Sequence, residues 1–404
     1  MTVPSFNPYN QQFQLNPYST YARLRKQAPI FKTIFDTWIV TSYALSDFIL
    51  KDSRFEIDNL PQRLDIKSTN YINPDFAKLS KIIDKWITFI NPPDHGRLKR
   101  AISPSFTLQA IEELRPYISE VISSYLINLK DDIKFDLMND LANPLSALSI
   151  TKLLGLPEAD AQQIQAWCAD TVSIFDQPAT LETYETQAIV LTECSDYLKT
   201  IILQQRKEPN PGLLSYLISQ QGLSNGLTDE EIIGTTILLA ATGQESTKGL
   251  FGNGILALLM DLNSLNALQE KPELIGKAVE ELLRFDSPIQ YVARRASEDV
   301  MILNNAIYKG DYVVVYLGAA NRDPEVYDKP DQLDFYRKTK NLGFGAGLHY
   351  CIGSFLAKLE MEIVLTFLLD RFAHRTIEVG PVTRSKSRIS RRLLSLPITI
   401  RSIL

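Results

Sequence analysis

The most informative part of this sequence is the stretch Phe344–Gly353, which reads FGAGLHYCIG. It directly precedes the amphipathic pattern FLAKLEMEIVLTFLL, which predicts a helix. A cysteine at the start of a helix is stabilised as a thiolate by the unpaired N–H groups and the dipole there. Gly345 and Gly347 allow backbone with positive φ and the close approach of a flat ligand, and Phe344 can screen the sulfur from water. The stretch would therefore suit a thiolate ligand at Cys351.

Two other interpretations of the same residues are open at this point. A lone cysteine at a helix start is commonly a small buried hydrophobic residue. The glycines of Gly343–Gly347 could also suggest a dinucleotide-binding loop. Their spacing is not GxGxxG and no strongly apolar strand precedes them, which disfavours the dinucleotide interpretation.

The composition limits the class of protein. The chain has 404 residues, of which 45% are hydrophobic and 22% charged, which is typical of a globular protein with a sizeable core. Its net charge of −5 gives no overall attraction to nucleic acid or to anionic lipid. Three cysteines and three histidines, without CxxC or HExxH spacing, argue against a disulfide framework and a histidine-rich metal site.

The N-terminus and the hydropathy pattern predict where the protein resides. The first residues, MTVPSFNPYNQQFQLNPY, lack a basic start followed by an apolar run, so we expect neither a signal peptide nor a membrane anchor. The most apolar stretch, 232–241, is too short to span a bilayer. We expect a cytoplasmic protein, and because no clear boundary interrupts the chain, a single domain over residues 1–404.

The periodicity predicts a mainly helical protein with small β-rich regions. Hairpins are expected over 30–43 and 300–317, and helices over 111–129, 157–173, 181–205 and 353–371. A helix of about thirty residues should begin at Thr228, which forms a capping box with Glu231. Another should begin at Pro272 and end before Ser287.

Two polar groups on these helices are candidates for a site. Glu281 and Arg284, spaced as ExxR, share a helix face, although most such pairs are exposed and weak. The long helix carries Thr242–Thr247, reading TGQEST, between apolar turns. Burying such a polar cluster in an apolar helix is costly. The simple alternatives are that the cluster forms an exposed face, or that it forms a kink where hydroxyls bond back to i−4 carbonyls.

Phe344–Gly353 has the full FGxGxHxCxG pattern of the cytochrome P450 family, and the sequence resembles the bacterial-type, soluble haem-thiolate monooxygenases. The resemblance implies that Cys351 is the proximal ligand of the iron of haem b. It also implies that His349 contacts a haem propionate, and that Phe344 and Gly345 border the cofactor.

Further propionate contacts follow from the resemblance. The segment 91–100, NPPDHGRLKR, resembles the family's DPPEHxRLR segment. His95 and Lys99 match the propionate-binding positions, with lysine where arginine is common. Arg294 resembles another propionate contact, and its neighbour Arg295 is the weaker candidate.

The resemblance also assigns the two polar groups. Glu281 and Arg284 would form the family's buried pair, with Arg337 as third partner, and would hold the cysteine loop. In the long helix Glu245 matches an acid and Ser246 an alcohol that relay protons to bound dioxygen, where threonine is usual in place of serine. The runner-up hydroxyls are Thr247 and Thr242.

The fold implied is a single mainly α domain with small β-sheets, a triangular prism with haem between the Thr228 helix and the helix after Cys351. The implied reaction inserts one atom of dioxygen into a C–H or C=C bond of a mostly apolar small molecule of secondary metabolism. Electrons would come from a separate ferredoxin or flavodoxin with its reductase. Residues 60–90 and 175–184 would form a lid. The expected substrate lining is Leu238, Ala241, Thr242, Ile289, Gln290 and Val292.

Alternatives keep the haem and change the chemistry. Direct use of peroxide is disfavoured by the acid–alcohol pair, whereas oxidative coupling, cyclisation or desaturation without oxygen insertion is not. A non-enzymatic gas-binding protein is a weaker alternative, and a helical scaffold without cofactor would make Cys351 and its glycines a coincidence. Arg97, Arg100 and Lys358 could dock an acidic redox partner or be ordinary surface charge.

Overall fold

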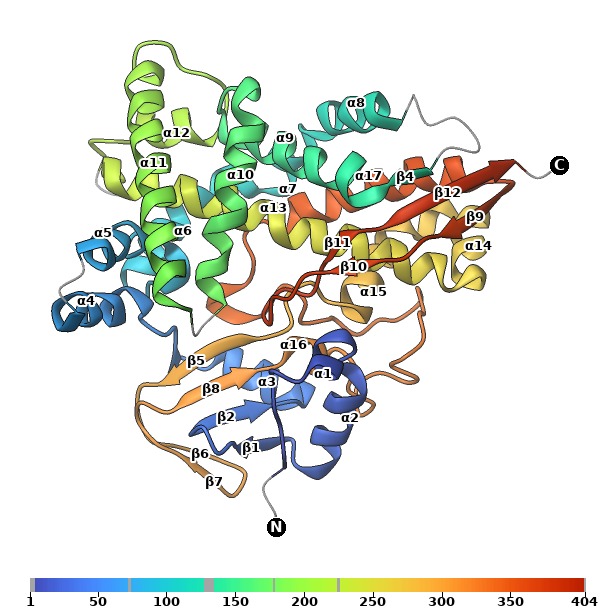
Figure 1. Ribbon diagram of the computed structural model, residues 1–404, viewed down its shortest axis with the longest axis horizontal. Coiled ribbons are helices and arrows are strands. Elements are labelled where there is room, and N and C mark those ends of the chain that lie inside the picture. The colour runs from blue at the N-terminus through green and yellow to red at the C-terminus, as the bar shows by residue number, and fades with distance from the viewer. Residues whose placement is uncertain (1–3, 72–73, 127–133, 177–178, 224–225, 403–404) are drawn as a thin grey trace. The chain divides into compact units, whose positions relative to one another are not determined.

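A computed structural model describes residues 4–71, 74–126, 134–176, 179–223 and 226–402 (Figure 1). Its contacts define two compact units that are described separately. Unit 1 comprises Met1–Asp58, Ile122–Ala142 and Lys248–Leu404. Unit 2 comprises Asn59–Val121 and Asn143–Thr247.

The main sheet of unit 1 has five strands in the order β1-β2-β8-β5-β3. Their bounds are Ile30–Lys32 (β1), Thr37–Val40 (β2), Phe55–Glu56 (β3), Val292–Ala296 (β5) and Tyr312–Val315 (β8). The hairpin expected over 30–43 is confirmed, because β1 and β2 pair antiparallel with Ile30 opposite Val40. Alternate residues of these strands, with Trp38, Val40, Val313 and Val315, pack into one buried apolar cluster.

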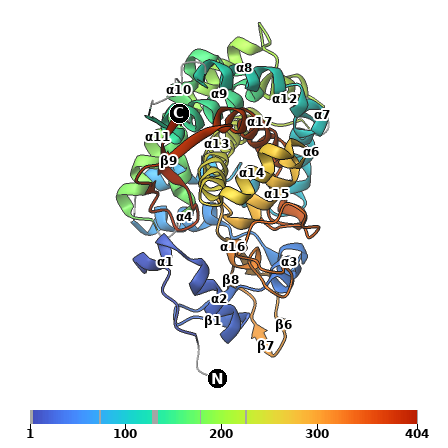
Figure 2. The same ribbon diagram turned by 90° about the vertical axis from the view of Figure 1, so that its right-hand side faces the viewer.

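The expected second hairpin is partly confirmed. Strands β6 (Val300–Ile302) and β7 (Asn305–Ile307) pair antiparallel, as both Figures 1 and 2 show. The chain then turns at Gly310, where φ is 90°, and β8 leaves the hairpin for the main sheet. There β8 runs parallel to β2 and antiparallel to β5, because its alternating valines complete the buried face.

Two smaller sheets in unit 1 involve the C-terminal part of the chain. Strand β12 (Pro397–Ser402) lies between β4 (Lys134–Asp136) and β9 (Arg375–Val379), antiparallel to both. Strands β10 (Thr383–Arg384) and β11 (Leu393–Ser395) form an antiparallel ribbon. The segment between β10 and β11 is therefore the tip of a hairpin.

The helices of unit 1 surround these sheets. They are α1 (Gln11–Leu15), α2 (Tyr18–Gln27), α3 (Tyr43–Lys51), α14 (Leu262–Glu270), α15 (Ile275–Phe285), α16 (Leu317–Ala320) and α17 (Ser354–Phe372). A 3-10 turn at Pro272–Leu274 precedes α15, which ends before Ser287 as expected. Helix α17 confirms the helix expected after the cysteine.

The described residues of unit 2 form helices joined by turns, with no strand. Its helices are α4 (Leu60–Tyr71), α5 (Pro74–Ile83), α6 (Asp94–Ile102), α7 (Leu108–Glu112), α9 (Asn143–Leu154), α10 (Ala161–Thr171), α11 (Leu181–Gln205) and α12 (Leu213–Ser219). Helix α8 (Arg115–Leu126) begins in unit 2. The helix expected over 111–129 is partly confirmed by α8, although the chain breaks between α7 and α8; residues 127–129 lie outside the described ranges.

The segment expected to be a lid loop over 60–90 is also different. It consists of α4, α5 and a 3-10 turn at Ile87–Phe89. Its aromatic side chains contact the other expected lid segment within unit 2. Phe76 meets Tyr184 edge-on with ring centroids 5.4 Å apart, and Trp86 lies 6.0 Å from Phe175. The two segments are thus one packed aromatic cluster.

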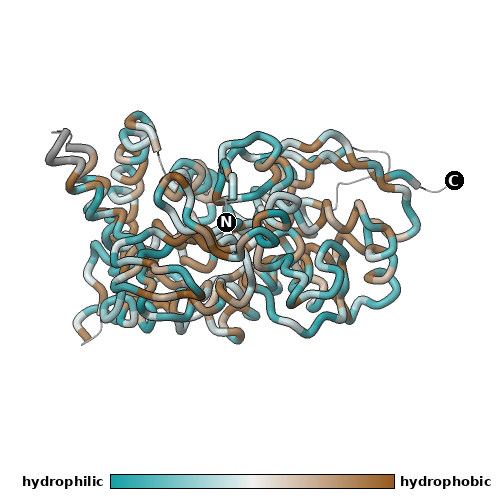
Figure 3. Tube along the Cα trace, turned by 90° about the horizontal axis from the view of Figure 1, so that it is seen from below, coloured by the Kyte–Doolittle hydropathy of each residue, from teal (hydrophilic) through white to brown (hydrophobic). Residues whose placement is uncertain are grey.

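The long helix α13 (Asp229–Leu259) has 31 residues and passes from unit 2 into unit 1. The capping box predicted at its start is confirmed. The Thr228 N–H donates to Glu231 Oε2 at 2.9 Å, and the Glu231 N–H donates to Thr228 Oγ1 at 3.3 Å. Among the described residues no helix is long and apolar enough to cross a membrane, and Figure 3 shows hydrophobic and hydrophilic residues intermingled along the trace.

Candidate active site

Cys351 lies at the end of a tight loop in unit 1. Gly345 and Gly347 have φ values of 72° and 69°, as the glycine pattern predicted. A Cβ on Gly347 would lie 2.4 Å from the Leu50 carbonyl oxygen. This position therefore requires glycine both for its positive φ and for lack of space. The Cys351 N–H donates to the Phe344 carbonyl at 3.0 Å, which closes the loop two residues before the Gly353 N-cap of α17. The Cys351 side chain is exposed.

The remaining loop residues border the same space. Phe344 and His349 are half-buried, and His349 belongs to a 3-10 turn, Gly347–His349. A Cβ added at Gly345 would meet only the His349 carbonyl at 3.9 Å, and one at Gly353 would meet nothing within 4 Å. The loop therefore leaves room beside its glycines that a flat group can fill.

A buried ion cluster in unit 1 holds this loop. Arg284 donates to both carboxylate oxygens of Glu281 at 2.7 Å, and Arg337 Nε donates to Glu281 at 3.0 Å. Arg284 also donates to the Asn321 carbonyl at 2.8 Å. Asn321 in turn accepts the Leu342 N–H at 2.7 Å, just before the loop. The three residues that sequence reasoning grouped are thus in contact, and a chain of hydrogen bonds connects them to the cysteine segment.

Arg294 is a buried cation on β5. Its side chain is 5% exposed and donates to the Ala293 carbonyl at 2.8 Å. Burial lowers the pKa of Arg294 to about 10. No carboxylate lies within ion-pair distance of it among the described residues. Since a buried guanidinium is costly without an anion, the position suits a carboxylate brought by a cofactor, such as a haem propionate. Arg295 is exposed and lies 4.0 Å from Asp58 instead.

In unit 2, His95 and Lys99 lie one turn apart on α6. His95 is 2% exposed. Burial, followed by the charge of Lys99, lowers the pKa of His95 to about 4, so the ring is neutral at physiological pH. A neutral imidazole next to an ammonium group offers an N–H donor and a positive charge to one anion. This pairing also suits a propionate.

The polar part of α13 continues as regular helix. Thr242 donates to the Leu238 carbonyl at 2.7 Å, Ser246 to the Thr242 carbonyl at 2.9 Å and Thr247 to the Gly243 carbonyl at 2.9 Å. Hydroxyl bonds to i−4 carbonyls were expected if the helix had a kink at this cluster, and here they occur without a break in the helix. Glu245 is nevertheless buried, which an exposed polar face would not produce.

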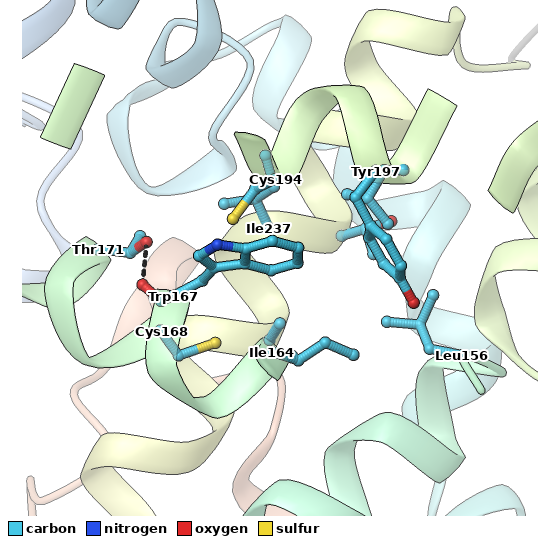
Figure 4. A pocket seen from close by; sticks show the side chains of 11 residues that line it. Leu156, Ile164, Trp167, Cys168, Thr171, Cys194, Tyr197 and Ile237 are labelled. Carbon is cyan, nitrogen blue, oxygen red and sulfur yellow. Dashed lines mark hydrogen bonds between the residues drawn. The ribbon is translucent and has the colours of Figure 1, made fainter. Parts of the chain in front are cut away.

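An apolar pocket in unit 2 lies against one face of α13. It lies between α10, α11 and α13, and Figure 4 shows Cys168 and Cys194 on its walls. From α13 it is lined by Thr236, Ile237 and Ala240, and Gln244 on the same side donates to Cys168 Sγ at 3.4 Å. At 100° per residue, Leu238, Ala241, Thr242 and Glu245 share a different face, roughly a third of a turn away. The expected lining and acid residues of α13 therefore point away from this pocket.

The lining expected from unit 1 needs one correction. Ile289 and Val292 are half-buried beside the apolar cluster of the main sheet. Gln290, in contrast, accepts from the Tyr21 hydroxyl at 2.9 Å, donates to the Ser287 carbonyl at 2.7 Å and packs against Gly318. Its side chain is committed to the core on the N-terminal side, so we remove it from the lining. The reason is local, because Gln290 precedes β5 and its side chain is held by the Tyr21 hydroxyl and the Ser287 carbonyl.

Sequence reasoning missed the segment that runs beside this lining. Ile289 forms a bridge with Ser390, and the Gln290 N–H donates to the Ile389 carbonyl at 2.8 Å. The hairpin tip between β10 and β11 thus borders the expected lining. The available signal was its composition, RSKSRISRR over 384–392, which is unusually basic.

The comparisons with known proteins agree with this geometry. The cytochrome P450 family profile matches residues 59–400. The chain is 37% identical to the biotin biosynthesis cytochrome P450 of Bacillus subtilis (strain 168), over 95% of this chain and 100% of that protein. It is 32% identical to the polyketide biosynthesis cytochrome P450 PksS of the same organism, over 98% of each chain.

A solved structure shows the same fold. The crystal structure of P450BioI in complex with hexadec-9Z-enoic acid ligated acyl carrier protein matches with a TM-score of 0.90 and 36% identity, covering 97% of this chain and 100% of that one. The thiol of Cys351 beside its glycines and the buried cation of Arg294 suit a haem with its propionates. Together with these matches, they show that the chain belongs to the cytochrome P450 family and is a haem b-dependent monooxygenase.

Proposed function

We propose that Cys351 is the iron ligand, and that Arg294, His349, His95 and Lys99 bind the propionates. The observation that carries this is the exposed thiol on a glycine loop whose backbone is fixed by the Glu281–Arg284–Arg337 cluster. When bound, haem supplies oxygen activation promoted by electron donation from the thiolate. We propose that both units serve one haem domain over residues 1–404, which the profile match across both units supports.

The protein's own part in proton supply is proposed for α13. Ser246 is half-buried and donates to the Thr242 carbonyl, whereas Thr247 is buried. By rotating about χ1, Ser246 would release that bond and its hydroxyl would be available as a proton donor, with Glu245 as the adjacent acid. Thr242 and Thr247 remain alternative hydroxyls, but Thr247 has less room to turn.

The proposed substrate is a long apolar acyl or polyketide-type chain of secondary metabolism. The printed names of the relatives support this class, since one acts in biotin biosynthesis, one in polyketide biosynthesis, and one was crystallised with an acylated carrier protein. Leu238, Ala241, Thr242, Ile289 and Val292 are proposed as lining. The expected outcome is insertion of one oxygen atom; oxidative coupling has no support from these relatives, and the mass of the product separates the two.

Electrons are proposed to come from a separate ferredoxin or flavodoxin with its reductase. Two of the three proposed docking cations have carboxylate partners within the chain, Arg97 with Glu231 and Lys358 with Glu280. Arg100 is therefore the remaining candidate of the three. No disulfide joins Cys168, Cys194 or Cys351, which suits a reducing compartment, and we propose the cytoplasm.

The identity of the iron ligand is tested with Cys351→Ser. We expect the reduced, CO-treated variant to lose the absorption band typical of thiolate ligation, while Cys168→Ser keeps it. The matched control is informative because Cys168 is buried in the pocket of unit 2. An unchanged carbonyl spectrum in Cys351→Ser would contradict the proposal. A screen of free fatty acids, acyl carrier protein adducts and macrolides by the spin-state shift of the haem tests the substrate class.

A further inference from the structure

The apolar pocket of unit 2 lies between α10, α11 and α13, and its walls carry two sulfur atoms (Figure 4). Because Cys168 and Cys194 both line it, we call it the thiol pocket. Only apolar atoms face its interior. A molecule that occupies the thiol pocket is therefore held by packing, without hydrogen bonds.

The hydroxyl and thiol groups of the thiol pocket offer little to a water molecule. Thr171 and Thr236 each donate to a carbonyl one turn earlier in the chain, both at 2.7 Å. Cys168 Sγ accepts from Gln244 Nε2 at 3.4 Å. Burial raises the pKa of Cys194 to about 12, so its thiol carries no charge. Water would lose hydrogen bonds here that the walls do not return, and we expect the pocket to be dry.

Two aromatic rings form the solvent side of the thiol pocket. Trp167 and Tyr197 are half-buried, whereas the other described lining residues are buried. The two rings are tilted by 56°, with centroids 5.3 Å apart. The Trp167 indole N–H donates to exposed Glu193 at 3.2 Å, and the Tyr197 hydroxyl donates to Asp160 at 2.7 Å. Both rings thus use their polar ends outside the pocket, and a small movement of either ring opens a way in.

The volume of the thiol pocket limits what it can hold. Its volume is about 20 Å³. A single water molecule needs about 10–15 Å³, and an apolar cavity that takes benzene or xenon measures about 150 Å³. The pocket therefore has room for one molecule of a few atoms, and none for the apolar chain proposed as substrate. Among the reactants of a monooxygenase, dioxygen is the one that is both this small and apolar.

We propose that the thiol pocket binds dioxygen and holds it against α13. A molecule without charge or hydrogen-bonding groups gains free energy when it leaves water for an apolar space. Ile237 and Ala240 of α13 line the pocket, while Leu238 and Ala241 lie on the helix face proposed to line the substrate site. The same helix thus borders both sites. The binding itself is independent of the proposed function; only delivery from the pocket to the iron rests on it.

Binding is tested on the ferric holoenzyme by NMR of isoleucine methyl groups under increasing pressure of dioxygen, which is paramagnetic and relaxes nearby protons. Dinitrogen at the same pressures is the control for pressure alone. We expect the dioxygen-induced relaxation at Ile164 and Ile237 of the pocket to be about fivefold that at Ile118. Ile118 is the matched reference, because it is also buried in unit 2 and does not line the pocket.

Filling the thiol pocket should abolish this excess. Ala240→Val adds bulk inside the pocket and should bring the ratio of pocket to reference relaxation to about one. Ala188→Val is the matched control, because it adds the same bulk at a buried position of α11 that does not line the pocket, and should keep the excess. If Ala240→Val does not fold, Cys194→Leu fills the pocket from α11. Equal relaxation at pocket and reference methyl groups, or an excess that survives filling, overturns the proposal.

Delivery is tested by the rate at which the reduced holoenzyme takes up dioxygen after flash photolysis of its carbonyl. A rate about twofold lower in Ala240→Val, but not in Ala188→Val, supports delivery from the thiol pocket. Equal rates, with the relaxation excess lost, overturn delivery and leave the binding site in place. The relaxation measurement does not depend on the iron ligand, so failure of the proposed function leaves its result intact.

Discussion

At the scale of single residues, the site combines an exposed thiol, Cys351, with buried basic groups whose burial is costly without an anionic partner. Arg294 is a buried cation beside a neutral backbone, and His95 is kept neutral next to Lys99. Such residues lower the stability of the protein alone and raise its affinity for an anionic cofactor.

The two glycines of the cysteine loop should differ in their tolerance of alanine. Both have positive φ, but a Cβ on Gly347 would lie 2.4 Å from the Leu50 carbonyl oxygen, whereas one on Gly345 would have 3.9 Å of clearance from its nearest neighbour. We expect Gly345→Ala to cost about 1–2 kcal/mol and Gly347→Ala clearly more. Thermal unfolding and haem content of the two variants give the comparison, and equal losses would contradict it.

Ser246 should control how well oxygen use is coupled to product formation. We expect Ser246→Ala to divert electrons to peroxide and to lower product per electron about tenfold, while Ser246→Thr retains coupling. Thr247→Val, which removes the runner-up hydroxyl, should keep coupling, because that hydroxyl is buried and bonded to the Gly243 carbonyl. Product and hydrogen peroxide are measured per NAD(P)H consumed. Full coupling in Ser246→Ala would transfer the role to Thr242 or Thr247.

At the scale of elements, local rules predicted those helices and strands whose signals are contiguous. The capping box at Thr228 and the periodicity of 181–205 placed α13 and α11 at their observed starts. The break between α7 and α8 was missed, because apolar periodicity continues across it while the backbone turns. The partner of β8 was missed as well, since parallel pairing with β2 joins strands that are far apart in sequence.

The site was predictable to a similar extent. Cys351, Glu281 and Arg284 were identified from motifs, and the structure places the latter two in contact. The side-chain direction of Gln290 was not predictable, because it depends on a bond to Tyr21, which is far away in the sequence. The pocket lined by residues 8–21, Gln290 and residues 384–392 was missed, because only folding brings these segments together.

Glu231 supports the start of α13 in two ways. It accepts the Thr228 N–H and pairs with Arg97, and although burial raises the pKa of Glu231, the bonds from Arg97 and Thr228 lower it overall. Because the folded pKa is lowered, this stabilisation is complete above the ordinary value of 4.5 and is lost as pH falls through the folded value.

We therefore expect Glu231→Gln to lower the free energy of unfolding by about 1–2 kcal/mol at neutral pH, and by less below the ordinary carboxyl range. Urea unfolding across this pH range measures the difference. Glu112→Gln, which removes an exposed i,i+3 pair with Arg115, serves as control and should change little. A pH-independent loss in Glu231→Gln would show that charge is not involved.

At the scale of the whole molecule, unit 1 is tied together by contacts between the ends of its sequence. Asp286 connects Tyr18 of α2, the end of α15 and Arg391 of the hairpin tip. Strand β12 is the central strand between β4 and β9. Few local contacts can replace these, so their loss should affect the entire unit.

Asp286→Asn should lower the free energy of unfolding by about 3 kcal/mol, because it leaves Arg391 buried among other arginines without a counter-charge. Asp331→Asn removes a different arginine contact, with Arg322, where the aspartate is 76% exposed, and should cost less than about 1 kcal/mol. Chemical denaturation of both variants gives the two values. Similar losses in the two would mean that burial of Asp286 carries no special weight.

The unequal exposure of the three sulfurs has a practical use. Cys168 and Cys194 are buried, and burial raises the pKa of Cys194 to about 12, whereas Cys351 is exposed. An alkylating reagent should mark one position per molecule, and only in molecules where no porphyrin covers it. Intact mass after brief alkylation would then count the unloaded fraction of any preparation directly, independent of its colour.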